Sequence, residues 1–330
     1  MVRLAASYSV IDSHTAGHPT RVILSGLPPL PGRSVAEKRD AFRAAHDHLR
    51  ASLLHEPAGH AAMVGLVPVA SEVAEFGAFF ISSYIYLDMC GHGAIGYAKT
   101  LAATGAIAAP RESFTLETPA GVVTVGLNWD ADGELRGVRI RNVPCRVGIA
   151  EATVDVPGFG AVAAGIVYGG MWYAIVDAQK AGVALSAENV TQGLAAGSAI
   201  KKALTAFLAD APAVQGGGSA PSVLFYRRES RLRAQHMLVL APNKFDRSPC
   251  GTGTSARLAL MAHQGEIADG ETYHAENLLG AAFTARIAER RATPMGQEIV
   301  PEIGGQAHIM SFATIVKEHG DPLAAGFLCQ

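Results

Sequence analysis

Cysteine is scarce in this sequence, with four residues among 330 and no Cys-x-x-Cys pair. Small folds that depend on disulfides carry a far higher density of cysteine, and structural zinc sites usually take paired cysteines. Histidines stand close together at His14/His18 and at His46/His48, but no cysteine or carboxylate cluster joins them at the spacing of zinc ligands. We therefore expect neither a disulfide scaffold nor a metal site.

A surplus of charge of one sign is also missing, since 27 basic and 29 acidic residues leave a net charge of −2. Such a balance argues against a broad surface for nucleic acid or anionic lipid. The glycine-rich run at 216–219 precedes no Gly-Lys-Ser/Thr, so we expect an ordinary loop and not a phosphate-binding one. A small molecule is the expected partner.

Membrane-targeting features are weak. The first residues lack the apolar core of a signal peptide, and the one long uncharged stretch, 156–176, contains Pro157 and five glycines. We interpret this stretch as buried strands and turns. The chain is expected to be a cytoplasmic protein.

Short runs rich in β-branched residues alternate with longer helical patterns. An Asp-Gly step at 132–133 separates two apolar runs and predicts a β-hairpin. Helices are expected over 34–54, 188–209 and 255–264, where apolar residues recur at helical spacing. The mixture is typical of an α+β fold.

The most informative feature is an internal repeat. Cys90-Gly91-His92-Gly93 and Cys250-Gly251-Thr252-Gly253 each open a helical stretch, and a glycine follows each cysteine after fifteen residues. The copies lie 160 residues apart, about half the chain, which suggests two similar domains. We expect one over 1–150 and one over 151–311, with 312–330 packing back onto the first.

A cysteine that precedes such a helix lies beside the unpaired N–H groups of the first turn. These groups and the helix dipole favour negative charge, so they are expected to lower the pKa of the thiol. The same N–H groups can bind a carboxylate, and glycine lets the backbone approach it closely. One such turn offers both a base and an anion site.

Two such turns offer more, because inversion at a carbon needs a base on one face and an acid on the other. Two thiols that share one proton can exchange these roles between the two directions. The carbanion would be stabilised by hydrogen bonds to its carboxylate and by exclusion of water. This chemistry requires neither pyridoxal phosphate nor a metal.

The two cysteine segments, the second extended to 246–254 (Asp-Arg-Ser-Pro-Cys-Gly-Thr-Gly-Thr), closely resemble the two signature segments of the proline racemase family. That family includes proline racemase, 4-hydroxyproline 2-epimerase and trans-3-hydroxy-L-proline dehydratase. The similarity extends over essentially the whole chain, through the segments 11–15, 19–22, 56–60, 168–170 and 321–323.

The resemblance implies a diaminopimelate-epimerase-like fold of two pseudo-symmetric domains, with the active site in the cleft between them. It implies a cofactor-independent isomerase that inverts Cα of proline or 4-hydroxyproline, in a monomer or homodimer. Cys90 and Cys250 match the catalytic thiols, and Asp246 matches the carboxylate that meets the substrate nitrogen. The remaining matched residues are the substrate-binding Gly91, His92, Gly251 and Thr252, and His14 is a further candidate for the pocket.

Two alternatives stay open. Dehydration of trans-3-hydroxyproline needs one base, but dehydratase-like members commonly carry threonine in place of the second cysteine, and this chain retains Cys250. A non-catalytic amino-acid-binding protein is the second alternative. One departure from the family pattern is Asp88, whose carboxylate would raise the pKa of the Cys90 thiol if it lay close to the sulfur.

Overall fold

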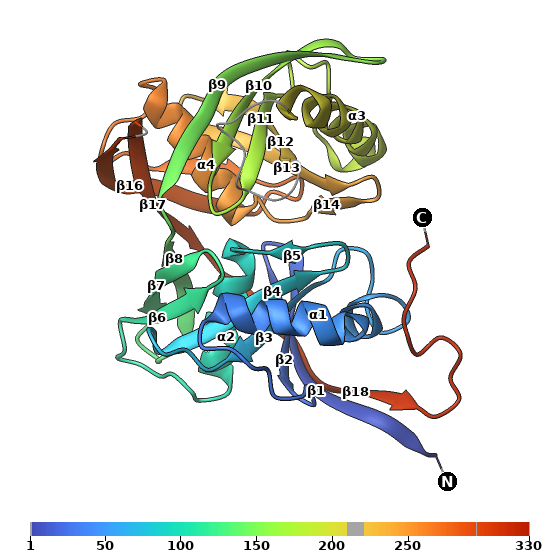
Figure 1. The fold of residues 1–330 in the computed structure, drawn as a ribbon. Coiled ribbons are helices and arrows are strands. Elements are labelled where there is room, and N and C mark those ends of the chain that lie inside the picture. The colour runs from blue at the N-terminus through green and yellow to red at the C-terminus, as the bar shows by residue number, and fades with distance from the viewer. Residues whose placement is uncertain (1, 210–220, 295, 330) are drawn as a thin grey trace. The chain divides into compact units, whose positions relative to one another are not determined.

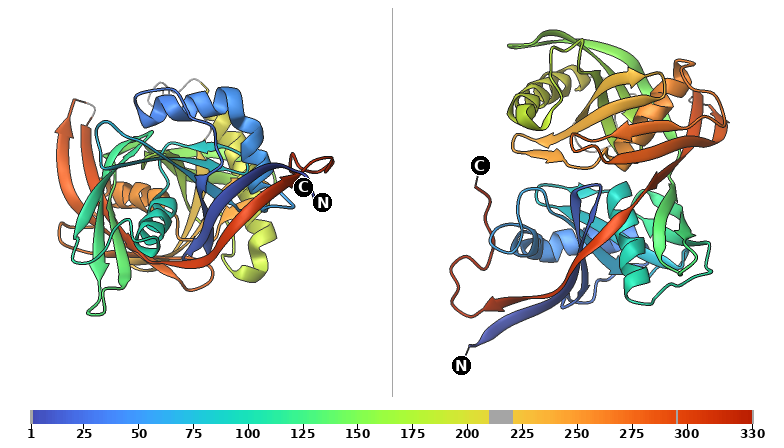
Figure 2. Two further views of the ribbon diagram at one scale, coloured as in Figure 1. Left: turned by 90° about the horizontal axis from the view of Figure 1, so that it is seen from below. Right: turned by 180° about the vertical axis from the view of Figure 1, so that it is seen from behind.

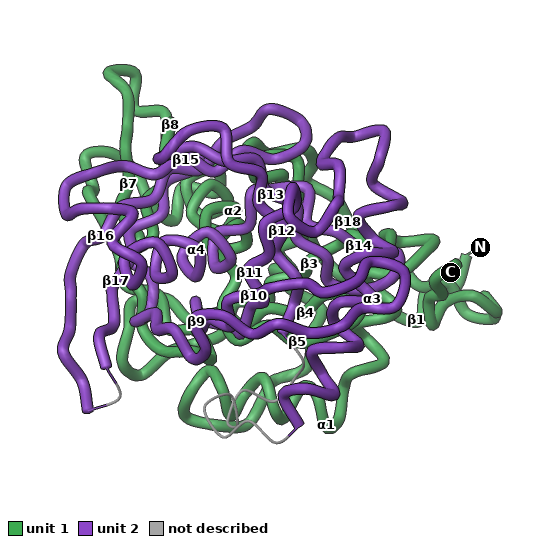
Figure 3. The backbone as a smooth tube through the Cα atoms, turned by 90° about the horizontal axis from the view of Figure 1, so that it is seen from above, with its two compact units in different colours: residues 1–140, 306–330 green, residues 141–305 purple. Residues whose placement is uncertain are grey.

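The computed structural model describes residues 2–209, 221–294 and 296–329, so the glycine-rich run at 216–219 lies outside the described residues. The chain forms two compact units (Figure 3). Unit 1 comprises Met1–Ile140 with Gln306–Gln330, and unit 2 comprises Arg141–Gly305. The boundary expected near residue 150 falls inside a strand, Cys145–Val156, and the units change ten residues before it.

Unit 1 is a mixed sheet with two helices (Figure 1). The order of pairing is β18–β1–β2–β3–β4–β6–β7, and the short β5 also pairs with β4. Its elements are β1 (Leu4–Thr15), β2 (His18–Ser25), α1 (Val35–Leu54), β3 (Val64–Val69), β4 (Phe76–Ser82), β5 (Tyr86–Leu87), α2 (Gly91–Ala103), β6 (Ser113–Thr118), β7 (Gly121–Trp129), β8 (Leu135–Arg141, whose last residue belongs to unit 2) and β18 (Ala307–Glu318).

The two helices of unit 1 differ in their burial. Helix α1 begins with a capping box, in which the Ser34 side chain accepts from the Glu37 N–H and the Glu37 side chain accepts in return. It lays Phe42 and Leu53 on the sheet in a core with Phe79. Helix α2 is buried over ten of its thirteen residues and packs against β1, β2, β3, β7 and β18.

Strands from the two ends of the chain meet in unit 1. β1 and β18 run antiparallel from the pair Leu4–Glu318 to the pair Thr15–Ala307, and Figure 2 shows them side by side. The segment from residue 306 onward belongs to this unit for that reason.

Unit 2 repeats the plan and closes it. Its strands pair in the order β9–β10–β11–β12–β13–β15–β16–β17, β17 returns to β9, and β14 adds to β13. Its elements are β9 (Cys145–Val156), β10 (Gly160–Tyr168), β11 (Trp172–Asp177), the 3-10 helix η1 (Ala187–Asn189), α3 (Val190–Leu208), β12 (Ser222–Ser230), β13 (Arg233–Ala241), β14 (Lys244–Asp246), α4 (Gly251–His263), β15 (Tyr273–Glu276), β16 (Ala282–Thr293) and β17 (Gly296–Gly305).

The correspondence between the units is topological. In each, one helix joins a parallel pair (β2–β3 around α1, β11–β12 around α3), and a second helix joins another (β4–β6 around α2, β13–β15 around α4). The second helix is the buried one in both cases, and α4 has twelve of its thirteen residues buried. Each cysteine of the repeat stands at the start of that buried helix.

Most expected elements are present. The helical patterns over 34–54, 188–209 and 255–264 correspond to α1, to η1 with α3, and to α4. The Asp-Gly step lies in a tight turn between β7 and β8, where the Asp130 N–H donates to Glu134 O at 3.0 Å and the Gly133 N–H to Asp130 O at 3.1 Å. The uncharged stretch forms β10 and β11, and none of the helices in the described ranges has the length and apolar character of a membrane span.

Candidate active site

The first thiol, that of Cys90, stands at the N-cap of α2. Its backbone is extended, its carbonyl accepts from the Ala94 N–H at 2.9 Å, and only 4% of the residue is exposed. The sulfur lies 3.4 Å from Nδ1 and 3.7 Å from Nε2 of His92. An imidazole at this distance can share a proton with the thiol. In a neutral ring one nitrogen donates a hydrogen bond and the other accepts one, and the tautomer decides which.

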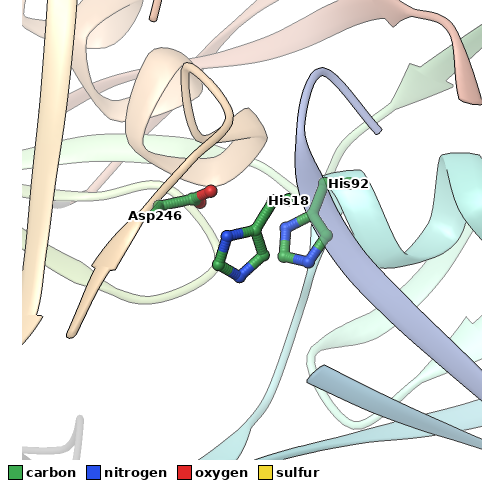
Figure 4. A group of neighbouring side chains, drawn as sticks. All are labelled: His18, His92 and Asp246. Carbon is green, nitrogen blue, oxygen red and sulfur yellow. The ribbon is translucent and has the colours of Figure 1, made fainter. Parts of the chain in front are cut away.

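His92 is itself held by β1 and β2. The Thr15 hydroxyl donates to the His92 carbonyl at 2.9 Å, and the His18 ring meets the His92 ring edge-on with centroids 4.4 Å apart. Figure 4 shows the two rings next to each other. We call Cys90, Gly91 and His92 the Cys90 half-site.

The second thiol, that of Cys250, stands at the N-cap of α4 with a different backbone. Its φ of 64° lies in the left-handed region, which is uncommon for a residue other than glycine. The Cys250 N–H donates to Ser248 Oγ at 3.1 Å, and the sulfur accepts from the Gly253 N–H at 3.2 Å. The helix start therefore faces the sulfur with a backbone donor, as the sequence predicts.

Asp246 ends β14, four residues before Cys250, and is 5% exposed. Its Oδ1 accepts from both the N–H and the hydroxyl of Ser248, each at 2.8 Å. Ser248 thus orients the carboxylate and the Cys250 backbone together. Figure 4 draws the Asp246 side chain at the end of its strand. We call Asp246, Cys250, Gly251 and Thr252 the Cys250 half-site.

A tyrosine completes the surroundings of the second thiol. The Tyr173 hydroxyl lies 2.5 Å from Thr252 Oγ1 and 3.8 Å from Cys250 Sγ, while Thr252 Oγ1 lies 3.7 Å from the same sulfur. All three residues are buried. Two hydroxyl groups therefore adjoin Cys250, where an imidazole adjoins Cys90.

The second glycine of each Cys-Gly-x-Gly motif lies under its own sulfur. A Cβ at Gly93 would come within 3.1 Å of Cys90 Sγ, and a Cβ at Gly253 within 3.0 Å of Cys250 Sγ. Both distances are tighter than most Cβ contacts in proteins, so a side chain at either position would require a neighbour to shift by a few tenths of an ångström. This close approach favours glycine at the end of the motif in both units.

The expectation of a lowered thiol pKa is wrong for Cys250. Burial is the larger cause and the Asp246 carboxylate the smaller one, and together they raise the pKa of this thiol to about 12. Hydrogen bonds from Gly253, Thr252 and Tyr173 act in the opposite direction but do not offset them. The loss of hydration raises the pKa of the sulfur more than the helix N-terminus lowers it, so Cys250 is a protonated thiol at neutral pH.

Two other expectations depend on where a side chain points. The Asp88 carboxylate forms an ion pair with Arg39, and its side chain is 55% exposed. This carboxylate is therefore paired with a cation and more than half exposed to solvent. His14 lies at the β1–β2 turn, where Nδ1 accepts from the Gly17 N–H at 3.3 Å and the ring packs beside His308. A pocket role for His14 stays a prediction.

The four cysteines are all free thiols, and they differ in environment. Cys145 is fully buried in β9, and burial raises its pKa well above the ordinary range of a thiol. Cys329 is exposed near the end of the chain. Only Cys90 and Cys250 combine burial with a helix start.

Three residues of these surroundings are not among the predicted site residues. Ser248 stands between the two residues that it orients, so the signature segment itself could have indicated it. His18 and Tyr173 reach the motif from neighbouring strands, and no local pattern reveals such a contact. Finding them requires the register of β2 and β11 against the helix starts.

Comparison with known proteins decides the family. The model of the proline racemase family matches residues 10–328. The chain belongs to the proline racemase family. It is 36% identical over 333 residues to the 4-hydroxyproline 2-epimerase of Streptosporangium roseum, covering 99% of this chain and 100% of that protein. It is 32% identical over 335 residues to the proline racemase of Clostridioides difficile, covering 99% of both chains. The family prediction is confirmed.

Solved structures confirm the fold of this proline racemase family member. A probable proline racemase from Agrobacterium radiobacter K84, with bound carbonate, matches at a TM-score of 0.89 with 25% identity, covering 98% of this chain and 96% of that one. A hydroxyproline epimerase from Agrobacterium vitis, with bound trans-4-hydroxy-L-proline, also gives 0.89, at 24% identity and with 99% and 97% coverage. A Bacillus anthracis protein of the PhzF family has the same fold class at a TM-score of 0.61 and 13% identity, covering 94% and 99%. The predicted α+β, diaminopimelate-epimerase-like fold is thus confirmed.

Proposed function

We propose that this protein is a cofactor-independent racemase or epimerase that inverts Cα of proline or 4-hydroxyproline with two cysteines. The observation that carries the proposal is the repeated cysteine, which begins a buried helix in each unit over a glycine that admits its sulfur. Family membership supports the same reaction class.

In the proposed mechanism the two half-sites act on opposite faces of one substrate. One sulfur, as thiolate, removes the α-proton: its S–H bond forms as the C–H bond breaks. The other thiol gives its proton to the carbanion on the opposite face and becomes the thiolate. Atoms and charge balance, and the enzyme is left ready for the reverse direction.

The roles of the neighbouring groups follow from their chemistry. The N–H groups of the first turns of α2 and α4 would bind the substrate carboxylate and stabilise the charge that develops on it. Asp246 would accept a hydrogen bond from the secondary ammonium, because a cation taken out of water needs a charged partner. Its fixed orientation by Ser248 suits that role.

The two thiols are expected to differ in protonation in the resting enzyme. Cys250 holds its proton because burial, and after it Asp246, raises the pKa of its thiol to about 12. Cys90, with the His92 ring at 3.4 Å, is the better candidate for the resting base. A substrate cation that pairs with Asp246 would cancel part of the field that holds the proton on Cys250. Binding would then make this acid able to exchange roles.

The substrate proposed first is 4-hydroxyproline, with proline second. The relative from Streptosporangium roseum at 36% identity is named for the former, and the relative from Clostridioides difficile at 32% is named for the latter. A cytoplasmic location, a monomer or homodimer, and a small-molecule partner without nucleic acid or membrane remain predictions.

The test follows Cα in heavy water. The protein is incubated with L-proline, D-proline or trans-4-hydroxy-L-proline, deuterium incorporation is read by proton NMR, and inversion is read by polarimetry. The wild type should exchange and invert. Cys90→Ser and Cys250→Ser should each lose inversion by about 10²–10⁴-fold, the usual contribution of one acid or base. Cys329→Ser, which removes an exposed thiol, serves as the matched control.

Three results would contradict the proposal. Undiminished inversion by Cys250→Ser would show that the second thiol is not the acid. A cyclic imine formed from trans-3-hydroxyproline, with no inversion of the other substrates, would indicate a dehydratase. Tight binding without exchange at Cα would indicate a non-catalytic binding protein.

A further inference from the structure

In each unit a polar side chain from a neighbouring strand contacts the third residue of the Cys-Gly-x-Gly motif. In unit 1 the register runs from Tyr86, four residues before Cys90, to its partner Ile81 on β4. From Ile81 it continues to Gly65 on β3, and from Gly65 to Arg21 on β2.

The same path can be followed in unit 2. Asp246, four residues before Cys250, pairs with Leu238 on β13. Leu238 pairs with Leu224 on β12, and Leu224 pairs with Ile175 on β11. Both paths cross one antiparallel pair, a second antiparallel pair and one parallel pair.

The two paths make Arg21 of unit 1 equivalent to Ile175 of unit 2. Two residues earlier, Pro19 is therefore equivalent to Tyr173. Proline has no polar side chain, and unit 1 instead uses the adjacent His18, whose ring contacts the His92 ring at 4.4 Å. Each unit thus supports the third motif residue from the start of the corresponding strand, with imidazoles in one unit and hydroxyl groups in the other.

We propose that Tyr173 is a positioning residue for the second thiol. Its hydroxyl joins Thr252 and the Cys250 sulfur in one hydrogen-bonded chain, and its counterpart in unit 1 is His18, whose ring contacts the His92 ring. This inference deepens the proposed function and rests on it, since it assigns a group that assists proton delivery by Cys250.

The argument is the two-way character of a phenol. While Cys250 is a thiol it donates toward the Tyr173 oxygen, 3.8 Å away, and the phenol can donate in turn to Thr252 Oγ1 at 2.5 Å. Once the thiol has given up its proton, the sulfur can only accept. Rotation of the hydroxyl groups then directs a donor at the sulfur without movement of any heavier atom.

Three supports surround the sulfur, and they differ in what they can do. The Gly253 N–H at 3.2 Å can only donate, so it stabilises the thiolate relative to the thiol. Thr252 and Tyr173 can reverse, and both are buried. Burial and Asp246 raise the pKa of Cys250, and these hydroxyl groups lower it. Without the phenol the thiolate is harder to form.

The experiment is Tyr173→Phe, which removes one oxygen and keeps the ring. The rate of alkylation by iodoacetamide is measured between pH 7 and 10 and resolved by mass spectrometry for the Cys250 peptide. A hydrogen bond to a charged group is worth about 1.5–3 kcal/mol, so labelling should fall by about 10–100-fold at each pH. The Cys90 peptide provides the internal reference and should not change. Inversion should fall by a similar factor.

The matched control is Tyr226→Phe, the same change on β12, where the Arg257 guanidinium lies 4.4 Å from the ring centroid. Its labelling profile should match the wild type. If Tyr173 only filled space, its loss would loosen the site and speed labelling of Cys250. Faster or unchanged labelling in Tyr173→Phe would therefore overturn the inference.

Failure of the inference can be told apart from failure of the proposed function. Labelling reports the Cys250 thiolate in the free protein and requires no substrate. If the wild type fails to exchange Cα of any proline derivative, the function falls whatever the labelling shows. If the wild type inverts its substrate while Tyr173→Phe labels and inverts normally, only the positioning role falls.

Discussion

Replacing Asp246 with asparagine should make the Cys250 thiol more reactive and the protein less active. The substitution removes one buried negative charge while leaving an oxygen that can still accept from Ser248, as Oδ1 now does at 2.8 Å twice. It therefore separates the electrostatic effect of the carboxylate on the Cys250 thiol from its hydrogen bonds with Ser248. The two effects have opposite signs, which few alternative explanations produce together.

The magnitude follows from the pKa of Cys250. Its rise from 9.0 to about 12 corresponds to roughly a thousandfold less thiolate at neutral pH, or ~4 kcal/mol. Burial is the larger cause of this rise and the Asp246 carboxylate the smaller, while three hydrogen bonds act against both. We expect Asp246→Asn to raise the thiolate population by about tenfold, which corresponds to one pKa unit. Activity should fall by about 10²-fold or more, because the substrate cation loses its charged partner.

The assay is peptide-resolved alkylation of Cys250 at pH 8, run beside inversion of 4-hydroxyproline. Asp155→Asn serves as the control, since it removes an exposed charge from β9 of the same unit. Labelling that is unchanged or slower in Asp246→Asn would refute the claim that the carboxylate holds the proton on Cys250. Faster labelling with full activity would refute only its role toward the substrate.

Three further predictions concern stability, measured by urea unfolding of the whole chain. Burial lowers the pKa of His236 to about 4, so the folded state binds fewer protons than the unfolded state between pH 4 and 6.5. The free energy of unfolding should therefore fall by about 2 kcal/mol from pH 8 to 5. His236→Gln should make the free energy of unfolding depend less on pH in this range. Gly169→Ala would place a Cβ 2.3 Å from the Thr252 carbonyl and should cost about 1–3 kcal/mol, whereas Gly137→Ala, whose nearest contact is 3.4 Å, should be close to neutral. Arg21→Lys should cost about 3 kcal/mol, since Arg21 donates twice to one carboxylate, at 2.8 and 2.7 Å, and also to two backbone carbonyls; a loss below 0.5 kcal/mol would contradict the assignment.

Much of the fold could be predicted from the sequence, because its strongest signals are local. Apolar residues at helical spacing predict α1, an Asp-Gly turn separates β7 from β8, and a repeated Cys-Gly-x-Gly starts α2 and α4. The repeat also predicts the correspondence between the units, since a duplicated motif at half the chain length implies a duplicated arrangement of strands. Apart from the comparison of the two copies, each of these inferences depends on residues that are close together in sequence.

The environment of the thiols could not be predicted in the same way. The pKa of Cys250 depends on how completely water is excluded from its sulfur, and burial of that kind results from packing of the whole unit. The contact of Tyr173 with Thr252 joins residues 79 positions apart. Asp88 stands two residues before Cys90, yet its carboxylate pairs with Arg39 on α1, a partner that the local sequence does not indicate.

Duplication explains the common frame of the two half-sites, and their divergence explains how they can differ in chemistry. A racemase that used two identical thiols would have no preferred resting state, because each proton arrangement would have the same free energy. Here one sulfur lies 3.4 Å from an imidazole nitrogen, while the other lies beside two hydroxyl groups and is influenced by a carboxylate. The extended backbone of Cys90 and the left-handed backbone of Cys250 add a further difference. On the proposed two-thiol mechanism, the free protein should hold the shared proton mainly on Cys250, and alkylation near neutral pH should label the Cys90 peptide first.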